Sequence, residues 1–184
     1  MTTDNNGMLW RELDSPIGPL SVYRHWNGAG VAHIEFGRFA ERESDLRAWA
    51  DRWWPGAGQS AWLEDAQCSL LGEAVRQLQN YFAGSLDRFT VPLDLRGTPF
   101  QRQVWQALTD IPFGEVRSYK QVAEAIGSPK AVRAVGGANN KNPVPIIVPC
   151  HRVIGADGGM VGYGGGLHIK LTLLGLEKPQ TDVI

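Results

Sequence analysis

The stretch Ile146-Ile147-Val148-Pro149-Cys150-His151-Arg152 joins an apolar run to a proline, a cysteine and two side chains that can carry positive charge. The apolar run is rich in β-branched residues and predicts a buried strand. Pro149 would end that strand, because proline has no N–H to donate to a neighbouring strand. Cys150 would then stand at the exit of the strand. A thiol beside His151 and Arg152 is expected to have a lowered pKa and to be available as a thiolate.

Two interpretations fit this stretch alone. A free cysteine next to a buried strand is usually a small apolar core residue. A cysteine next to a histidine is also the pair that nucleophilic catalysis uses. The spacing by itself does not decide between a core thiol and a nucleophile.

Length and composition indicate an ordinary globular protein. The 184 residues are enough for one large domain or two small ones, and 43% of them are hydrophobic and 20% charged. No apolar run approaches the ~20 residues that a membrane-spanning helix needs. Residues 1–7 are polar and lack the charged-then-apolar layout of a signal peptide. We therefore expect a cytoplasmic protein that does not associate with membranes.

The cysteines and histidines indicate neither disulfides nor a metal site. Two cysteines cannot build a disulfide framework, which is typical of a reducing compartment. They cannot build a cysteine-rich zinc site either. Cys68, without a histidine or basic neighbour, is predicted to be structural. No metal-ligand spacing is found among the four histidines, His25, His33, His151 and His168.

The charge distribution predicts two domains, residues 1–95 and 96–184. The first holds 8 Lys and Arg against 13 Asp and Glu, a net charge of −5, and the second holds 10 against 6, a net charge of +4. All five lysines lie in the second part. A basic part can approach a polyanion, although +4 is within the range of ordinary domains.

The first domain begins with signals for a small sheet. Residues 8–13 and 20–26 flank a turn-rich segment, 15–19, and predict a hairpin. Residues 31–36 alternate between apolar and polar and predict a third strand. These strands would form the sheet of a scaffold.

Two helices and a further strand are expected before the domain junction at Arg96-Gly97. The helices cover residues 38–54 and 70–82, and residues 89–95 are strand-like. Three tryptophans in the first helix could form a stacking platform, but their helical spacing favours core packing. They are Trp49, Trp53 and Trp54.

The second domain is dense in helix-start signals. Thr98-Pro99-Phe100-Gln101 supplies an N-cap, a proline at the first helical position and a capping-box glutamine. Ser118-Tyr119-Lys120-Gln121 is a second capping box, and Gly127 would end its helix. We expect a third helix to begin at Ser128-Pro129 and to end at Asn139. Two short helices joined by a tight turn form the helix-turn-helix pattern, although many such pairs bind nothing.

The third of these helices carries little that could read base edges. A helix in the major groove offers long polar side chains, whereas this one offers alanines and glycines, with Arg133 as its only long arginine. Glycine inside a helix costs about 1 kcal/mol relative to alanine, so Gly136-Gly137 requires a reason. One reason is close packing against another helix. The other is a thin face that fits the minor groove while Arg133 enters the base stack, which would bind duplexes without choosing a sequence.

Further motifs follow these in a fixed order. They are Tyr119 in Ser-Tyr-Lys-Gln, Arg133 to Ala138, Asn142-Pro143, Pro149 to Ile154, Gly162 to Gly166, Lys170, Leu173-Leu174 and Glu177. Together they closely resemble the O6-alkylguanine-DNA alkyltransferases, or methylated-DNA–protein-cysteine methyltransferases. The resemblance covers essentially all of residues 98–178 and is weaker, but recognisable, at 15–20 and 81–84.

The resemblance implies a catalytic role for five residues. Cys150 would be the alkyl acceptor, and His151 would generate its thiolate through a water molecule. Glu177 would orient and stabilise that histidine. The water implied by the resemblance is structurally sensible, because adjacent residues of an extended chain point to opposite sides. Asn142 would brace the turn around the site, and Tyr119 would swing the 3′ phosphate and assist the leaving base.

Binding residues are implied in the same way. Arg133 would replace the flipped nucleotide in the duplex. The remaining DNA-binding residues would be Lys130, Ala134, Gly136, Gly137 and Tyr119. A guanine pocket would be formed by backbone groups near Cys150 and by Val153, Tyr163, Gly164 and Gly165.

The fold implied by the resemblance is α+β. It consists of a ribonuclease H-like N-terminal part, with a small antiparallel sheet and helices, and a mostly helical C-terminal winged helix-turn-helix domain. The implied function is DNA repair by irreversible transfer of the alkyl group of O6-alkylguanine, and also of O4-alkylthymine, to Cys150. The thioether product lacks the sulfur–sulfur bond that thiol exchange requires. Each molecule would therefore react once, without a cofactor, on double-stranded DNA of any sequence. The protein would act as a monomer, with cooperative binding along DNA left open.

Three other classes of protein fit less well. A nonenzymatic lesion-binding relative would be expected to lack the acceptor cysteine, and a helix-turn-helix regulator would need a polar recognition helix. A cysteine hydrolase would need an oxyanion or peptide-cleft signature. The chain also departs from the family pattern, because Gly164 stands where many members have serine or alanine. It has no cysteine equivalents of the zinc ligands of some relatives, and no phosphotriester-sensing extension.

Overall fold

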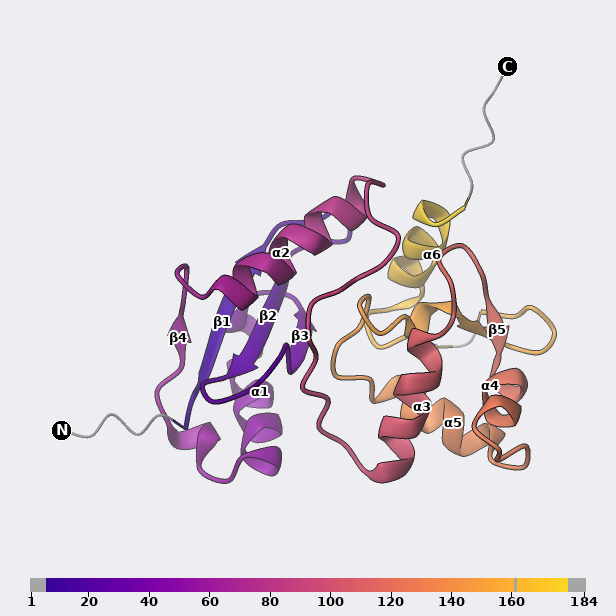
Figure 1. Ribbon diagram of the computed structural model, residues 1–184, viewed down its shortest axis with the longest axis horizontal. Coiled ribbons are helices and arrows are strands. Elements are labelled where there is room, and N and C mark those ends of the chain that lie inside the picture. Colours follow the sequence, from indigo (N-terminus) through magenta and orange to yellow (C-terminus); the bar gives the residue numbers. More distant parts are fainter. Residues whose placement is uncertain (1–5, 161, 179–184) are drawn as a thin grey trace, which may run out of the picture. The chain divides into compact units, whose positions relative to one another are not determined.

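The computed structural model describes residues 6–160 and 162–178, and the chain divides into two compact units between Arg96 and Gly97 (Figure 1). The outer ends of the two predicted domains, residues 1–5 and 179–184, lie outside the described residues. Within the described part, no helix is long and apolar enough to cross a bilayer. The mixture of a small sheet and several helices confirms the predicted α+β class.

The N-terminal unit contains a four-stranded sheet in the order β3-β2-β1-β4. Strands β1 (Met8–Leu13) and β2 (Leu20–His25) form the predicted antiparallel hairpin, and β2 pairs with β3 (His33–Phe36). Strand β4 (Leu63–Glu64) pairs in parallel with β1 and was not predicted. Its two residues are both exposed, so no hydrophobic alternation announces them.

Helices cover both faces of this sheet. Successive strand residues face opposite sides, and helix α2 (Ser69–Phe82) contacts β1 and β2 on the side seen in Figure 1. On the other side, helix α1 (Phe39–Trp53) and the 3₁₀ helix η1 (Ala57–Gln59) enclose a core. That core consists of Met8, Tyr23, Ala32, Leu46, Ala50, Trp54, Ala57 and Trp62, with Trp49 and Trp53 packed against it. The prediction that the tryptophan cluster is core packing is confirmed.

The prediction of a strand at residues 89–95 is wrong. This segment forms only an isolated bridge between Val31 and Leu93. Val31 donates its N–H to the Pro92 carbonyl, and the Asp94 N–H returns to the Val31 carbonyl. Pro92 has no N–H of its own, which limits how far such a ladder can extend.

The C-terminal unit is mostly helical. It contains α3 (Pro99–Thr109), α4 (Tyr119–Ala125), α5 (Val132–Asn140) and α6 (Leu167–Leu176). Two short strands, β5 (Arg117–Ser118) and β6 (Val153–Ile154), pair in parallel. The 3₁₀ helix η2 (Cys150–Arg152) directly precedes β6.

Both predicted capping boxes are confirmed. The Gln101 N–H donates to the Thr98 hydroxyl at 3.2 Å, and the Thr98 N–H donates to the Gln101 side chain at 2.9 Å. Ser118 and Gln121 exchange the same pair of bonds at the start of α4. These bonds satisfy N–H groups that have no partner inside the helix.

Helix α5 begins later than predicted. Residues 128–131 form a turn, closed by the Ala131 N–H and the Ser128 carbonyl at 2.8 Å, and the helix begins at Val132. Pro129 therefore occupies the second position of a turn, which its fixed φ also suits, rather than the first position of a helix.

The buried strand predicted at 146–148 is also wrong. The segment is buried as expected, but it is a turn in which Ile146 has a φ of 75°. Pro145 and Val148 form only an isolated bridge. A short apolar run shows that a segment is buried without showing that it is extended.

Candidate active site

Cys150 is held at the end of a braced turn. The Asn142 side chain donates from Nδ2 to the Val148 carbonyl at 2.8 Å and accepts the Val144 N–H on Oδ1 at 3.0 Å. These two bonds replace the ladder that a strand would have supplied. Cys150 is only 4% exposed.

The sequence predicts an extended backbone at Cys150, but the structure has a turn there. Cys150, His151 and Arg152 form a single 3₁₀ turn, in which the Val153 N–H donates to the Cys150 carbonyl. Neighbouring side chains of such a turn diverge by about 120°. The 3₁₀ turn, and not the predicted extended chain, therefore directs the side chains of Cys150 and His151 apart.

Glu177 connects the two residues that follow the cysteine. Its Oε1 lies 2.7 Å from His151 Nε2, and Arg152 donates to the same carboxylate from Nε at 2.8 Å and from Nη2 at 2.9 Å. Arg152 Nη1 also donates to the Ile111 carbonyl at 2.6 Å. All three charged or titratable side chains are buried. A buried charge is tolerated only when it is paired and hydrogen-bonded in this way.

His151 is arranged as a neutral base. Burial lowers the pKa of His151, and its bond to Glu177 acts in the opposite direction. Because a carboxylate can only accept, Nε2 carries the proton and Nδ1 keeps its lone pair. Nδ1 is buried and makes no hydrogen bond to the described residues.

The predicted low pKa of the cysteine is wrong. Burial raises the pKa of the Cys150 thiol, and hydrogen bonds with Asn142 and Tyr163 and the charge of Lys170 oppose this only in part. Arg152 is engaged with Glu177 instead of with the thiol. The sequence shows that His151 and Arg152 follow Cys150, but it does not show that Arg152 pairs with Glu177.

Lys170 is a site residue that sequence reasoning did not identify as one. It is fully buried on α6, and its Nζ lies 2.6 Å from the Val153 carbonyl. Burial lowers the pKa of Lys170, and the nearby Cys150 raises it. A signal was present, since Lys170 is the only lysine or arginine in the apolar sequence of α6. Sequence analysis also missed the pairing of Arg152 with Glu177, because no local sequence pattern indicates a partner 25 residues away.

Tyr119 and Tyr163 both approach the thiol. Burial and the neighbouring Cys150 raise the pKa of Tyr119, and the nearby Tyr163 acts to lower the pKa of the Cys150 thiol. Val153 is buried, whereas Gly164 is exposed and Gly165 partly exposed. The structure therefore brings Cys150 together with most of the predicted catalytic residues.

The glycines of α5 are not explained by packing inside the described part of the unit. A Cβ on Gly136 would lie 3.9 Å from the Tyr119 ring, which is ordinary contact, and a Cβ on Gly137 would meet nothing within 4 Å. Arg133 and Ala134 are exposed on the same helix, and Lys130 is exposed in the turn before it. Close packing against another helix, the first of the two interpretations, therefore does not account for Gly137.

Cys68 differs from the prediction in one respect. It precedes α2 as its N-cap residue, but Arg24 Nη1 lies 3.6 Å from its sulfur. The statement that it has no basic neighbour is wrong. Arg24 also donates to the carbonyls of Trp26 and Gly28, so its main role is to hold a turn.

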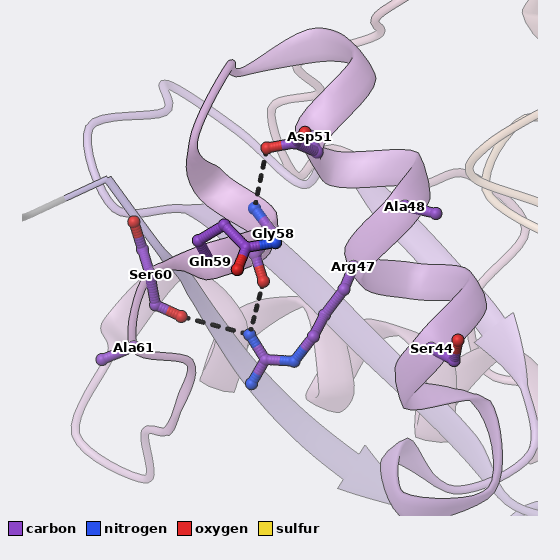
Figure 2. A pocket seen from close by; sticks show the side chains of 8 residues that line it. All are labelled: Ser44, Arg47, Ala48, Asp51, Gly58, Gln59, Ser60 and Ala61. Carbon is purple, nitrogen blue, oxygen red and sulfur yellow. Dashed lines mark hydrogen bonds between the residues drawn. The ribbon is translucent and has the colours of Figure 1, made fainter.

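A concave region lies in the N-terminal unit (Figure 2). This hollow of about 640 Å³ contains Arg47, which donates to the carbonyls of Gly58 at 3.0 Å and Ser60 at 3.1 Å. Asp51 accepts the N–H groups of Gly56 and Gly58. Its charged groups thus serve to fix the loop around η1. Among the described residues there is also no cluster of three His, Cys, Asp or Glu that could hold a metal.

Comparisons with known proteins define the class of this site. Residues 99–179 match the family model of the 6-O-methylguanine DNA methyltransferase DNA-binding domain. Residues 8–95 match the model of the ribonuclease-like domain of the same proteins. The chain belongs to the 6-O-methylguanine DNA methyltransferase family.

Individual relatives cover nearly the whole chain. A methylated-DNA–protein-cysteine methyltransferase of Mycobacterium leprae is 50% identical over 170 residues, 92% of each chain. The crystal structure of Mycobacterium tuberculosis OGT in complex with DNA aligns with a TM-score of 0.74 at 46% identity, also over 92% of each chain. A Methanosarcina barkeri relative of the same name is 44% identical over 171 residues.

The buried Glu177 cluster predicts a large stability effect. Substituting Glu177→Gln keeps the shape of the side chain but leaves the Arg152 charge buried without its counter-charge. We expect a loss of about 3 kcal/mol in the free energy of unfolding, measured by urea denaturation at neutral pH. As a control, Glu73→Gln removes an exposed partner of Arg76 and should change the free energy of unfolding far less, because solvent screens an exposed ion pair. Equal, small losses in both variants would show that the cluster is not held by charge.

Proposed function

We propose that this protein repairs double-stranded DNA by transferring the alkyl group of O6-alkylguanine to Cys150. The activity is the one that the name of the Mycobacterium leprae relative describes. The observation that carries the proposal is the buried thiol of Cys150 preceding a neutral histidine that Glu177 fixes in one tautomer. Such an order of nucleophile, base and orienting carboxylate is what nucleophilic catalysis requires.

The reaction begins with removal of the thiol proton. His151 Nδ1 takes the proton of Cys150 through one bridging water, and Glu177 stabilises the imidazolium that results. Because burial keeps the pKa of His151 low, the imidazole is unprotonated and ready at neutral pH. Lys170, Asn142 and Tyr163 favour the thiolate once it forms.

Transfer then exchanges one bond for another. The thiolate attacks the alkyl carbon in line with the C–O6 bond, a C–S bond forms, and the C–O6 electron pair passes to the guanine ring. The departing base is protonated, with the Tyr119 hydroxyl as the assisting donor. The sulfur remains as a thioether, so each chain reacts once and needs no cofactor.

Access to the base is proposed to involve flipping. A base inside a duplex cannot reach a buried thiol, so enzymes acting on bases rotate the nucleotide out. The exposed, glycine-thinned face of α5 would lie in the minor groove, and Arg133 would fill the space that the nucleotide leaves. Lys130 and the backbone of residues 134–137 would contact phosphates without sequence preference.

The two units are proposed to have separate roles. Residues 1–95 would be a scaffold, and residues 96–184 would carry the DNA-binding helix and the acceptor cysteine. Both cysteines are free thiols, which suits a reducing cytoplasm. Val153, Tyr163, Gly164 and Gly165 would line the base pocket, and the small Gly164 would allow O4-alkylthymine as a second substrate. We propose that the protein acts as a monomer.

Direct mapping of the transferred group tests the central step. A duplex with a labelled methyl group on O6 of one guanine should transfer one label per chain, found by peptide mass on Cys150. Cys150→Ser should accept none, whereas Cys68→Ser is the matched control and should react like the unchanged protein. Label on another residue, or many turnovers per chain, would refute the proposal.

The role of Arg133 predicts a difference between substrates. Arg133→Ala should slow the reaction with duplex O6-methylguanine by about tenfold or more, since flipping costs a few kcal/mol that the arginine would offset. Reaction with free O6-benzylguanine should not change. Arg133→Lys keeps the positive charge but changes the shape of the side chain, and Arg88→Ala removes one positive charge from the N-terminal unit instead. Equal slowing on duplex and free base would be incompatible with a role in the base stack.

A further inference from the structure

Arg152 is a buried arginine whose hydrogen bonds link it to the proposed base. It is 6% exposed, and it donates to Glu177 from Nε to Oε2 at 2.8 Å and from Nη2 to Oε1 at 2.9 Å. The same Oε1 lies 2.7 Å from His151 Nε2. The guanidinium and the imidazole therefore share one carboxylate oxygen.

This sharing places a permanent positive charge close to the imidazole. Because both donor nitrogens lie within 3 Å of Glu177 Oε1, the guanidinium comes within about 6 Å of the imidazole, a range in which one charge changes a pKa by about one unit or more. An arginine side chain stays protonated in proteins. Burial lowers the pKa of His151, Glu177 raises it, and Arg152 lowers it in turn.

Glu177 without this arginine would impair the base that it orients. A buried carboxylate in contact with an imidazole favours the imidazolium. The imidazolium carries a proton on both nitrogens, so Nδ1 has no lone pair with which to take the thiol proton. The carboxylate fixes the tautomer of His151, but its charge has to be balanced if the imidazole is to remain neutral. Arg152 supplies that balance from the opposite side of the carboxylate.

The other charges around His151 are fewer or more distant from solvent-shielded contact. Lys170 also acts to lower the pKa of His151, but its Nζ is directed to the Val153 carbonyl at 2.6 Å. Cys150 precedes the histidine on η2, and α3 and α6 pack against this turn. On these helices and in residues 110–115, the remaining charged or titratable side chains belong to exposed residues, where solvent screens them: Arg102, Asp110, Glu115 and His168.

Resting on the proposed function, we propose that Arg152 is a positioning residue that keeps His151 unprotonated between reactions by sharing the carboxylate of Glu177 with it. The histidine retains its tautomer because the Nε2 bond to Glu177 is preserved. The thiol proton can then move through the bridging water to Nδ1. In that step one S–H bond breaks and one N–H bond forms, while Arg152 and Glu177 keep their charges.

The protonation of His151 can be measured in the free protein without any alkyl transfer. ¹⁵N NMR of the imidazole distinguishes the neutral ring from the imidazolium, and the His151 signals are identified by their loss in His151→Asn. We expect a neutral ring at pH 7 in the unchanged protein. In Arg152→Gln the midpoint of protonation should rise by about one pH unit or more. Arg152→Lys keeps the charge and should titrate close to the unchanged protein.

The pH dependence of transfer tests the consequence for the reaction. Rates are measured from pH 5 to pH 9 with free O6-benzylguanine, so that DNA binding does not enter. The rate should fall in acid as His151 becomes protonated, and in Arg152→Gln this fall should occur at higher pH. The variant should be about tenfold slower below both midpoints and should recover at the alkaline end. Arg102→Gln removes an exposed arginine from α3 and should leave the profile unchanged.

A second pair of variants covers the case in which Arg152→Gln does not fold. Glu177→Gln is compared with the double variant Arg152→Gln and Glu177→Gln, which buries no unpaired charge at these two positions. Removal of the guanidinium is then the only difference between the two proteins. The midpoint of His151 protonation should be higher in the double variant by about one pH unit. Equal midpoints in this pair would contradict the proposal.

The remaining outcomes separate this role from a structural one and from the proposed function. An unshifted His151 midpoint in Arg152→Gln, or equal slowing at every pH, would overturn the proposal, because a merely structural arginine would not move the pH profile. A raised midpoint in a protein that transfers no alkyl group to Cys150 at any pH would support the link between Arg152 and His151. The same result would overturn the proposed function.

Discussion

The buried carboxylate of Glu177 is the group on which the candidate active site depends. It follows α6 directly and receives hydrogen bonds from both His151 and Arg152. An unpaired carboxylate or guanidinium at this depth would be strongly destabilising, so each of the three groups requires the others. Their mutual pairing sets the tautomer of the imidazole and ties α6 to the turn that presents Cys150.

This arrangement favours a protonated thiol in the free protein. Burial raises the pKa of Cys150 and simultaneously lowers the pKa of His151, so a protonated nucleophile stands beside an unprotonated base. A thiol that is protonated at rest is protected against other electrophiles. Asn142, Tyr163 and Lys170 surround the sulfur and lower the free energy of the thiolate after the proton has left.

Local chemistry made part of this structure predictable from sequence. Thr98 and Ser118 begin helices because each capping box is complete within four residues, and the ordered motifs identified the family to which the chain belongs. Features set by distant partners were not predictable. Ile146 belongs to a turn because Asn142 braces it, Arg152 turns toward Glu177, and burial outweighs the charges near Cys150. The two exposed residues of β4 carry no pattern at all. The roles of the site residues stay predictions that experiments on this chain must test.

The most direct test of a resting, protonated thiol is titration of Cys150 in the free protein. Thiolate absorbance in the ultraviolet, measured in a Cys68→Ser background against a variant that lacks both cysteines, reports on this residue alone. Because burial raises the pKa of Cys150 from its ordinary value of 9.0, we expect no thiolate at neutral pH and its appearance only above pH 9. A thiolate already present at pH 7 would show that the site stores an activated nucleophile, which contradicts the role assigned to His151.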